Sequence, residues 1–203
     1  RSSAKFGLEH TIQTNRSKST LNSGFEWRKI NKQNLIARYG FNKNVNLVSA
    51  FDWQDKQNTN QFFTGSNYHY ISRSAFPELF YQNVKGYRMG LFYKYLEAAN
   101  AKDLGAEEAY ITEVGAEFRY FIINKGNIDA KLTSHTINFR GNTNSPMAFD
   151  LMNGLSNGKN LTWVVGFGGK AAGNIQINIS YEGRKAGENK PIHIGRAEAR
   201  YIF

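Results

Sequence analysis

Histidine is the residue type in this sequence best suited to metal binding or acid–base chemistry, and its four copies are widely spaced. They are His10, His69, His135 and His193, and none belongs to an HExxH or HxxE motif, in which two ligands share one face of an element. The sequence contains no cysteine, which excludes disulfides, thiolate metal ligands and a thiol nucleophile. We therefore expect no metal site and no cofactor.

The neighbouring residues Ser134 and His135 could serve a barrel hydrolase, because a hydroxyl activated by an imidazole is the basis of Ser–His hydrolysis. No GxSxG motif accompanies them. The glycine cluster at residues 166–169 lies in a predicted strand and precedes no helix, so it is not a phosphate-binding loop. Its glycines instead favour close approach of a neighbouring strand or side chain. We expect no catalytic activity and keep a hydrolase based on His135 as an alternative.

The charge raises the question of an acidic partner. Lys and Arg number 26 against 16 Asp and Glu, a formal net charge of +10. The basic residues are dispersed rather than gathered in runs, and no RNA- or DNA-binding motif is apparent. We therefore expect no nucleic-acid partner and favour a basic surface near anionic lipopolysaccharide.

The composition favours strands. Aromatic residues make up 14% of the chain, which also has 19 Gly and only 3 Pro. Aromatic-rich, proline-poor sequences punctuated by glycine and asparagine are typical of strands joined by tight turns. The sequence contains no run of about 18 apolar residues, so it predicts no transmembrane helix.

Apolar side chains recur at every second position in long rows, which places them on one face of each strand. The opposite positions hold charges of both signs, such as Glu113 and Arg119. None of the best rows contains Lys, Arg, Asp or Glu over its core, as expected for a face that contacts lipid. The residues predicted to face lipid are Tyr110, Val114, Phe118, Tyr120, Leu161, Trp163, Val165, Phe167, Ile175, Ile177, Ile179 and Tyr181. The same rows would also suit the shared core of a sandwich or a soluble barrel, with the charges as a solvated face.

About eleven strands are predicted, each close to the ~9–11 residues that cross a bilayer as a tilted strand. Irregular spacing over 24–36 also allows a short helix there, and Pro77 predicts a break at 74–80. Tight turns and longer loops otherwise alternate along the chain, as in outer-membrane barrels. The predicted strands cover residues 4–14, 20–29, 34–42, 44–54, 61–72, 84–97, 107–123, 127–140, 159–170, 174–185 and 191–203.

The longest predicted loop, residues 141–158, carries its own apolar residues, Met147, Phe149, Leu151 and Met152. Long loops with apolar anchors are often functional. This loop can plug a pore or contact a partner protein, and we favour the partner contact.

The C-terminal segment places Gly195, Tyr201 and Phe203 on one face. A terminal aromatic residue with a second aromatic two positions earlier resembles the β-signal recognised by the outer-membrane insertion machinery. A buried edge strand ending in an aromatic is the alternative.

Residues 153–203 as a whole resemble the C-terminal end of long Bacteroidota cell-envelope proteins. The likeness lies in residues 154–160, Thr162-Trp163, residues 181–185, residues 193–195 and residues 200–203. The resemblance covers a quarter of the chain and brings no catalytic residues with it. It implies an outer-membrane location and a longer precursor, to which the odd strand count also points.

The sequence thus predicts an all-β chain, residues 1–203, that forms an antiparallel up-and-down transmembrane barrel or the C-terminal segment of a larger one. The expected role is structural, transport or complex assembly in the bacterial outer membrane, with lipid, lipopolysaccharide, the insertion machinery and other envelope proteins as partners. The alternatives are a soluble cell-surface β-sandwich that binds a ligand and an outer-membrane barrel hydrolase.

Overall fold

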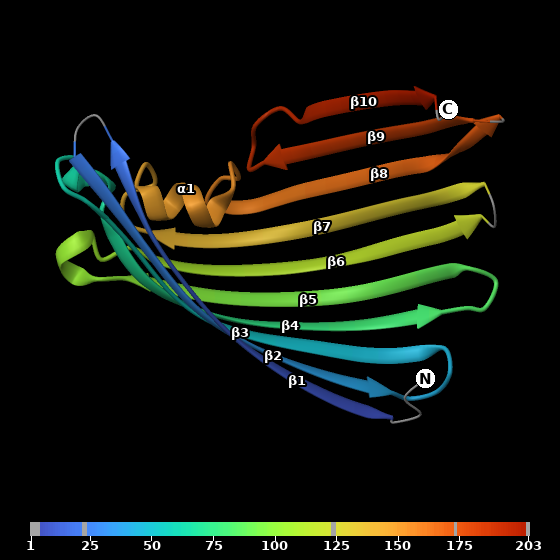
Figure 1. The fold of residues 1–203 in the computed structure, drawn as a ribbon, viewed down its shortest axis with the longest axis horizontal. Helices are drawn as coiled ribbons and strands as arrows, with labels where there is room; N and C mark the ends of the chain where they lie inside the picture. Colours follow the sequence, from blue (N-terminus) through green and yellow to red (C-terminus); the bar gives the residue numbers. More distant parts are fainter. Residues whose placement is uncertain (1–4, 22–23, 123–124, 173, 202–203) are drawn as a thin grey trace.

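Ten antiparallel strands form a single sheet in which each strand pairs with the next along the chain (Figure 1). The computed structural model describes residues 5–21, 24–122, 125–172 and 174–201. Within these residues, no helix has the length and apolar character that crossing a membrane requires. The strands are β1 (Phe6–Leu21), β2 (Gly24–Gly40), β3 (Val45–Asn60), β4 (Tyr68–Gln82), β5 (Tyr87–Asn100), β6 (Glu108–Ile122), β7 (Gly126–Arg140), β8 (Gly158–Ala172), β9 (Ile175–Ala186) and β10 (Ile192–Tyr201).

The all-β prediction is confirmed, but the strands at the N-terminal end are fewer and longer than predicted. The segments 4–14, 20–29 and 34–42 merge into β1 and β2, and no helix forms over 24–36. The gap predicted between residues 14 and 20 does not exist, because Asn15, Ser17 and Ser19 pair with β2 and continue strand β1. The described strands therefore number ten, close to the predicted eleven but even, so the odd count no longer points to a longer chain.

The break predicted at Pro77 is also wrong, because Pro77 lies inside β4 and pairs with Ser49 of β3. On the other side, the β4–β5 pairing reaches Ala75↔Tyr95 and resumes at Glu78↔Phe92. Proline has no N–H to donate, so the ladder is interrupted locally while the strand continues.

With the β4–β5 turn at residues 83–86, short and long connections alternate from β2 to β9. Tight turns join β2 to β3 and β4 to β5 at one end of the sheet, the turn end (Figure 1). The opposite, loop end carries the helical turns η1 (Thr64–Ser66) and η2 (Lys102–Leu104), and the helix α1 (Pro146–Met152). The chain begins and ends its strands at the turn end, so β1 and β10 run in opposite directions.

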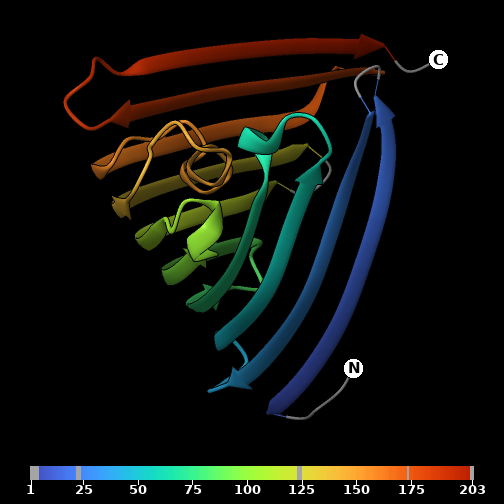
Figure 2. The same ribbon diagram turned by 90° about the vertical axis from the view of Figure 1, so that its left-hand side faces the viewer.

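The sheet curls into a deep trough, with α1 lying in its concave side near the loop end (Figure 2). Among the described strands, β1 is hydrogen-bonded to β2 and β10 to β9, so these two form the edges of an open sheet. The buried core is small and lies between α1 and the concave face of β4 to β7. Its members are Tyr70, Ala98, Ala109, Ile111, Ile137, Phe139, Met147, Ala148 and Met152.

The sequence of α1 explains why the long loop folds back. Ser145 is the N-cap and its hydroxyl accepts a hydrogen bond from the N–H of Ala148, while Pro146 occupies the first turn, where no donor is needed. Asn153 ends the helix in the left-handed conformation. Met147 and Ala148 are thereby held against the sheet with no exposed surface.

Glycines inside the strands make room for aromatic rings. The ring of Phe92 lies over Gly115 on the concave face, and the indole of Trp163 lies over Gly183 on the outer face. A ring packed over a strand glycine covers backbone that would otherwise be exposed. Gly166 similarly admits the carboxylate of Asp129, as the sequence predicted for that glycine cluster.

The substitution Gly115→Ala should destabilise the sheet by about 1–3 kcal/mol, because overpacking forces neighbouring groups to shift. The added Cβ would come within 2.3 Å of the Phe92 ring and 2.6 Å of the Leu132 carbonyl oxygen. Urea unfolding followed by tryptophan fluorescence measures the change. In the control Gly7→Ala the nearest atom to the new Cβ is 3.9 Å away, so little effect is expected. Equal midpoints for the two variants would contradict the packing role of Gly115.

Candidate functional site

The two faces of the sheet have opposite character, and the outer face is apolar. Because α1 packs on Ile111 and Ile137, the alternate positions of β6 and β7 point outward. Residues paired across adjacent strands point to the same face, so the pairing also identifies the outward-pointing residues of β8, β9 and β10. All the residues predicted to face lipid lie on the outer face: Tyr110, Val114, Phe118, Tyr120, Leu161, Trp163, Val165, Phe167, Ile175, Ile177, Ile179 and Tyr181.

We call the middle of this outer face the apolar band. Among its described positions there is no Lys, Arg, Asp or Glu. Its side chains are strongly exposed: Leu91 by 65%, Val114 by 55% and Leu132 by 51%. Contiguous apolar surface of this extent needs a cover of lipid or protein. Its apolar members are Leu8, Ile12, Leu35, Ala37, Leu47, Phe51, Ala75, Leu79, Met89, Leu91, Tyr93, Val114, Ala116, Phe118, Ala130, Leu132, Trp163, Val165, Phe167, Ile177, Ile179, Ala197 and Ala199. The polar residues His10, Gln33, Ser49 and Ser134 lie among them.

Aromatic side chains border the apolar band at both ends. Tyr39, Tyr81, Tyr87 and Tyr120 lie on the outer face at the turn end, and the rings of Tyr81 and Tyr87 are 6.1 Å apart. Trp53, Tyr95 and Tyr110 lie at the other border. Between the borders, the strands have about the length that crosses the hydrocarbon core of a bilayer.

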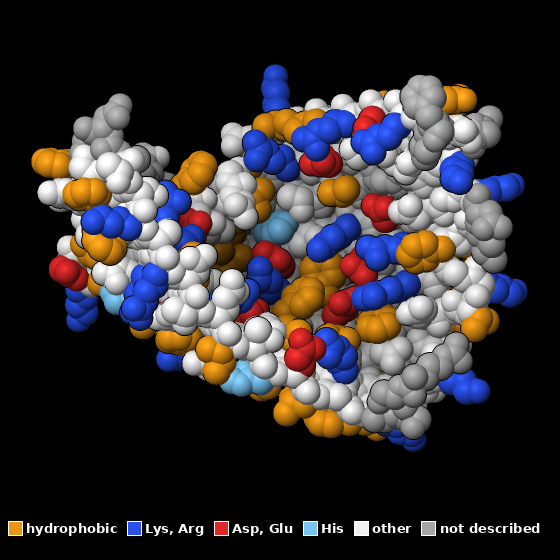
Figure 3. Space-filling view, in the orientation of Figure 1, with side chains coloured by type: hydrophobic (Ala, Val, Ile, Leu, Met, Phe, Trp, Pro, Cys, Tyr) orange, Lys and Arg blue, Asp and Glu red, His pale blue; other side chains and the backbone are white. Residues whose placement is uncertain are grey.

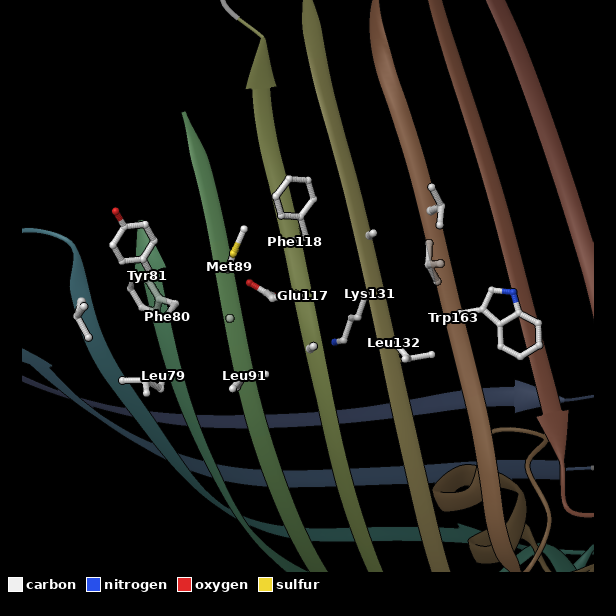
Figure 4. A pocket seen from close by; sticks show the side chains of 16 residues that line it. Leu79, Phe80, Tyr81, Met89, Leu91, Glu117, Phe118, Lys131, Leu132 and Trp163 are labelled. Atoms are coloured by element: carbon white, nitrogen blue, oxygen red, sulfur yellow. The ribbon is translucent and has the colours of Figure 1, made fainter. Parts of the chain in front are cut away.

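The centre of the apolar band is hollowed into a groove of about 810 Å³ (Figure 4). The small side chains of Ala116 and Ala130 form its floor, because the residues beside them in the ladder, Leu91, Leu132 and Val165, are much larger. Most of its lining is apolar, which suits hydrocarbon chains, and it also includes Glu117 and Lys131 of the concave face.

The concave face is polar and rich in ion pairs (Figure 3). Arg88 lies between Glu78 and Glu117, with 3.3 Å from its Nε to Glu117 Oε1. Lys94 is 3.6 Å from Glu113. Strand alternation places every charge predicted for this side there, which confirms the predicted sorting of the two faces. These residues are Arg88, Lys94, Glu113, Glu117, Arg119, Lys131, Glu182, Arg184, Arg196, Glu198 and Arg200.

His135 takes part in this polar network. Its Nε2 is 2.8 Å from the hydroxyl of Thr162, and its Nδ1 is 3.5 Å from Glu113. Ser134 points to the outer face, so the sequence neighbours Ser134 and His135 do not form a pair. Thr162, His135 and Glu113 are arranged in the order of nucleophile, base and acid. The backbone N–H and C=O groups around Thr162, however, are hydrogen-bonded within the sheet to β7 and β9. Those N–H groups offer no oxyanion hole there.

The other histidines are scattered, and within the described residues no three His, Asp or Glu side chains gather as metal ligands. His193 lies on the outer face, stacked against Tyr181 at 5.9 Å between ring centroids and near Trp163. His69 is 2.9 Å from Asp55 at the loop end.

The helix α1 is fixed in the trough by Asp150. The carboxylate accepts hydrogen bonds from Lys56 Nζ at 2.8 Å and from the hydroxyl of Tyr70. Of the four residues predicted to contact a partner, Met147 and Met152 are buried, Leu151 packs on the core, and Phe149 is 79% exposed. Only Phe149 among them presents a large free surface, and partner binding stays a prediction.

The residues predicted as a β-signal lie at the last strand. Gly195 and Tyr201 occupy outer-face positions of β10, opposite Tyr181 and Ile175. Phe203 lies outside the described residues. The anchoring role of Asp150 was missed in the sequence because its partners Lys56 and Tyr70 are distant along the chain.

The substitution Asp150→Ala should release α1 from the trough. Hydrogen bonds to a charged group contribute about 1.5–3 kcal/mol, and Tyr70, only 2% exposed, would lose its partner. We expect α1 to lose its protection, with faster hydrogen exchange and proteolysis over residues 141–158. Asp103→Ala removes an exposed acid in the neighbouring loop and is the matched control. Unchanged protection in Asp150→Ala would rule out the anchor.

No protein-family model matches this sequence, and no curated protein matches it either.

Proposed function

We propose that this chain is an outer-membrane β-barrel protein, or the barrel segment of one, from a Gram-negative bacterium of the Bacteroidota. Its role is structural, transport or complex assembly, without catalysis. The apolar band contacts the acyl chains of the membrane, and the loop end faces the cell exterior.

The apolar band is the observation that carries this proposal. A charge-free, half-exposed apolar zone with aromatic borders on both sides is what a bilayer requires of a protein surface. A soluble sandwich would need a second layer over the same face. The described strands all belong to one sheet, and the helix packs on the opposite side.

The concave face supports a filled interior rather than a wide channel. Paired charges occupy it, and α1 narrows its loop end. These features favour a structural or assembly role over passive diffusion of solutes. The β-signal positions Gly195, Tyr201 and Phe203 suit delivery by the outer-membrane insertion machinery, and Phe149 suits contact with another envelope protein.

The substitution Leu132→Arg tests the lipid contact. In a bilayer an Arg at this depth costs about 2–4 kcal/mol, whereas at an exposed site in water it costs close to nothing. We expect the variant to fold poorly into phospholipid bilayers, measured by the loss of heat-modifiable mobility on a gel. Val164→Arg is the matched control, because Val164 lies on the concave face opposite Glu182. A wild-type chain that is a soluble monomer without detergent would end the proposal.

Pairing of β1 with β10 is the second requirement of a barrel and is also testable. The two strands run antiparallel and the chain has no cysteine, so introduced cysteines report without background. We expect Ile12→Cys combined with Ala197→Cys or with Ala199→Cys to form a disulfide within one folded molecule. Opposite residues of paired antiparallel strands have Cα atoms about 4.5–5.5 Å apart, within the range of about 4.4–6.8 Å that a disulfide spans. Disulfides that appear only in dimers would show that a second copy completes the sheet. Ala116→Cys with Ala197→Cys, both on the outer face but on strands far apart in the sheet, controls for random oxidation.

A further inference from the structure

Three basic side chains gather on the outer face of β1 and β2 beyond the apolar band, towards the loop end. They are Arg16, Lys18 and Lys29, which we call the basic cluster. Arg16 lies directly opposite Lys29 in the β1–β2 register. Like charges directly opposite on one face of a sheet destabilise it. The positive charges of Arg16 and Lys29 therefore need a negative counter-charge, which a bound anion would supply.

No carboxylate supplies that counter-charge. Among the described residues, none of the three basic side chains forms an ion pair, because Glu26 pairs with Arg28 on the concave face and Asp55 pairs with His69. Two other basic residues on the outer face at the loop end have acidic neighbours across the strands, whereas Lys159 and Lys185 form no ion pair among the described residues. Arg73 is 3.7 Å from Glu97, and Arg140 is 3.7 Å from Glu108.

The basic cluster surrounds a hollow of about 580 Å³ with an aromatic wall. Lys18 Nζ lies 3.9 Å from the ring centroid of Phe25 and 4.5 Å from that of Trp27. Trp27 lines the hollow and is 54% exposed. Basic and aromatic side chains of this kind, placed together, are typical of the headgroup level of a membrane surface. In Figure 3 basic side chains lie over the first strands at the left of the view.

The position of the basic cluster relative to the apolar band matches the shape of a lipid. Ile12 of the band lies on the same face of β1 as Arg16, and four residues of strand separate them by about 13 Å. On the neighbouring strand β2, Leu35 of the apolar band lies opposite His10 of β1. A molecule with acyl chains along the band would therefore place its headgroup at the cluster.

We propose that Arg16, Lys18 and Lys29 bind the phosphate groups of an anionic, acylated glycolipid of the lipopolysaccharide type in the outer leaflet. This proposal rests on the proposed function, because it requires the apolar band to lie in lipid. The phosphates supply the counter-charge for Arg16 and Lys29, and the sugar rings pack against Trp27.

The test uses the full chain folded in detergent micelles, with insertion checked first by heat-modifiable mobility. Diphosphorylated lipid A is titrated and binding is followed by tryptophan fluorescence and by the rise in unfolding temperature. We expect Arg16→Gln with Lys29→Gln to weaken binding about tenfold or more. The same loss is expected for the wild-type chain when the lipid A is dephosphorylated. Inorganic pyrophosphate should bind far more weakly than the lipid, which separates a lipid site from a site for free phosphate.

Two variants control for fold and for general charge. Arg73→Gln with Arg140→Gln removes two basic residues from the same rim and should leave affinity within about threefold, because both are ion-paired. Arg16→Lys with Lys29→Arg keeps the charge and should keep the binding.

The outcomes separate the two proposals. A chain that inserts but binds lipid A equally well with and without the basic cluster would overturn this site while leaving the proposed function intact. Pyrophosphate binding as tight as that of lipid A would also overturn it. A chain that does not insert would overturn both.

Discussion

The pairing of each strand with the next fixes which side chains share a face, and the rest of the structure depends on that constraint. Because successive residues point to opposite sides, one register at Leu132↔Trp163 sets the orientation of β7 and β8 together. A slip of one residue would move the apolar band into the trough and the charges outward. The hydrogen-bonded pairing of the strands therefore keeps the apolar side chains on one side of the sheet and the charged side chains on the other.

The concave charges are stabilised by this geometry rather than by burial of hydrophobic groups. The small core lies under α1, whereas the turn-end half of the trough is held by contacts such as Arg88 with Glu117 and Lys131 over the ring of Phe92. Charges in a confined space must be paired or they cost free energy. Opposite signs on adjacent strands meet that requirement at Lys94 and Glu113. The basic cluster on the outer face departs from this pattern, and this departure is the reason for proposing an external anion as its partner.

The alternation of apolar and polar residues could be predicted from the sequence, and with it the all-β fold and the face of each residue from β5 to β10. The strand boundaries near the N-terminal end could not be predicted from the sequence. There the alternation continues through residues that are polar on both sides, and periodicity of hydrophobicity carries no signal when both faces are polar. Pro77 was misleading for a different reason, since an interrupted ladder on one side does not end a strand that is paired on the other. The contact of Asp150 with Lys56 depends on how far the sheet curls, which no local pattern encodes.

The edge strands link the fold to the membrane proposal. All described residues of β10 are exposed, as is nearly all of β1, so these strands contribute least to the packing of the chain alone. Exposed edges of this length invite pairing with another strand. The described strands are even in number, with β1 beginning and β10 ending at the turn end, so the two edges can meet antiparallel. That closure would bring His193 of β10 towards the strand that carries Arg16. Lipid around the apolar band would favour such closure, because unpaired backbone groups are costly in hydrocarbon. The same environment that covers the outer face would thus also drive the trough to become a barrel.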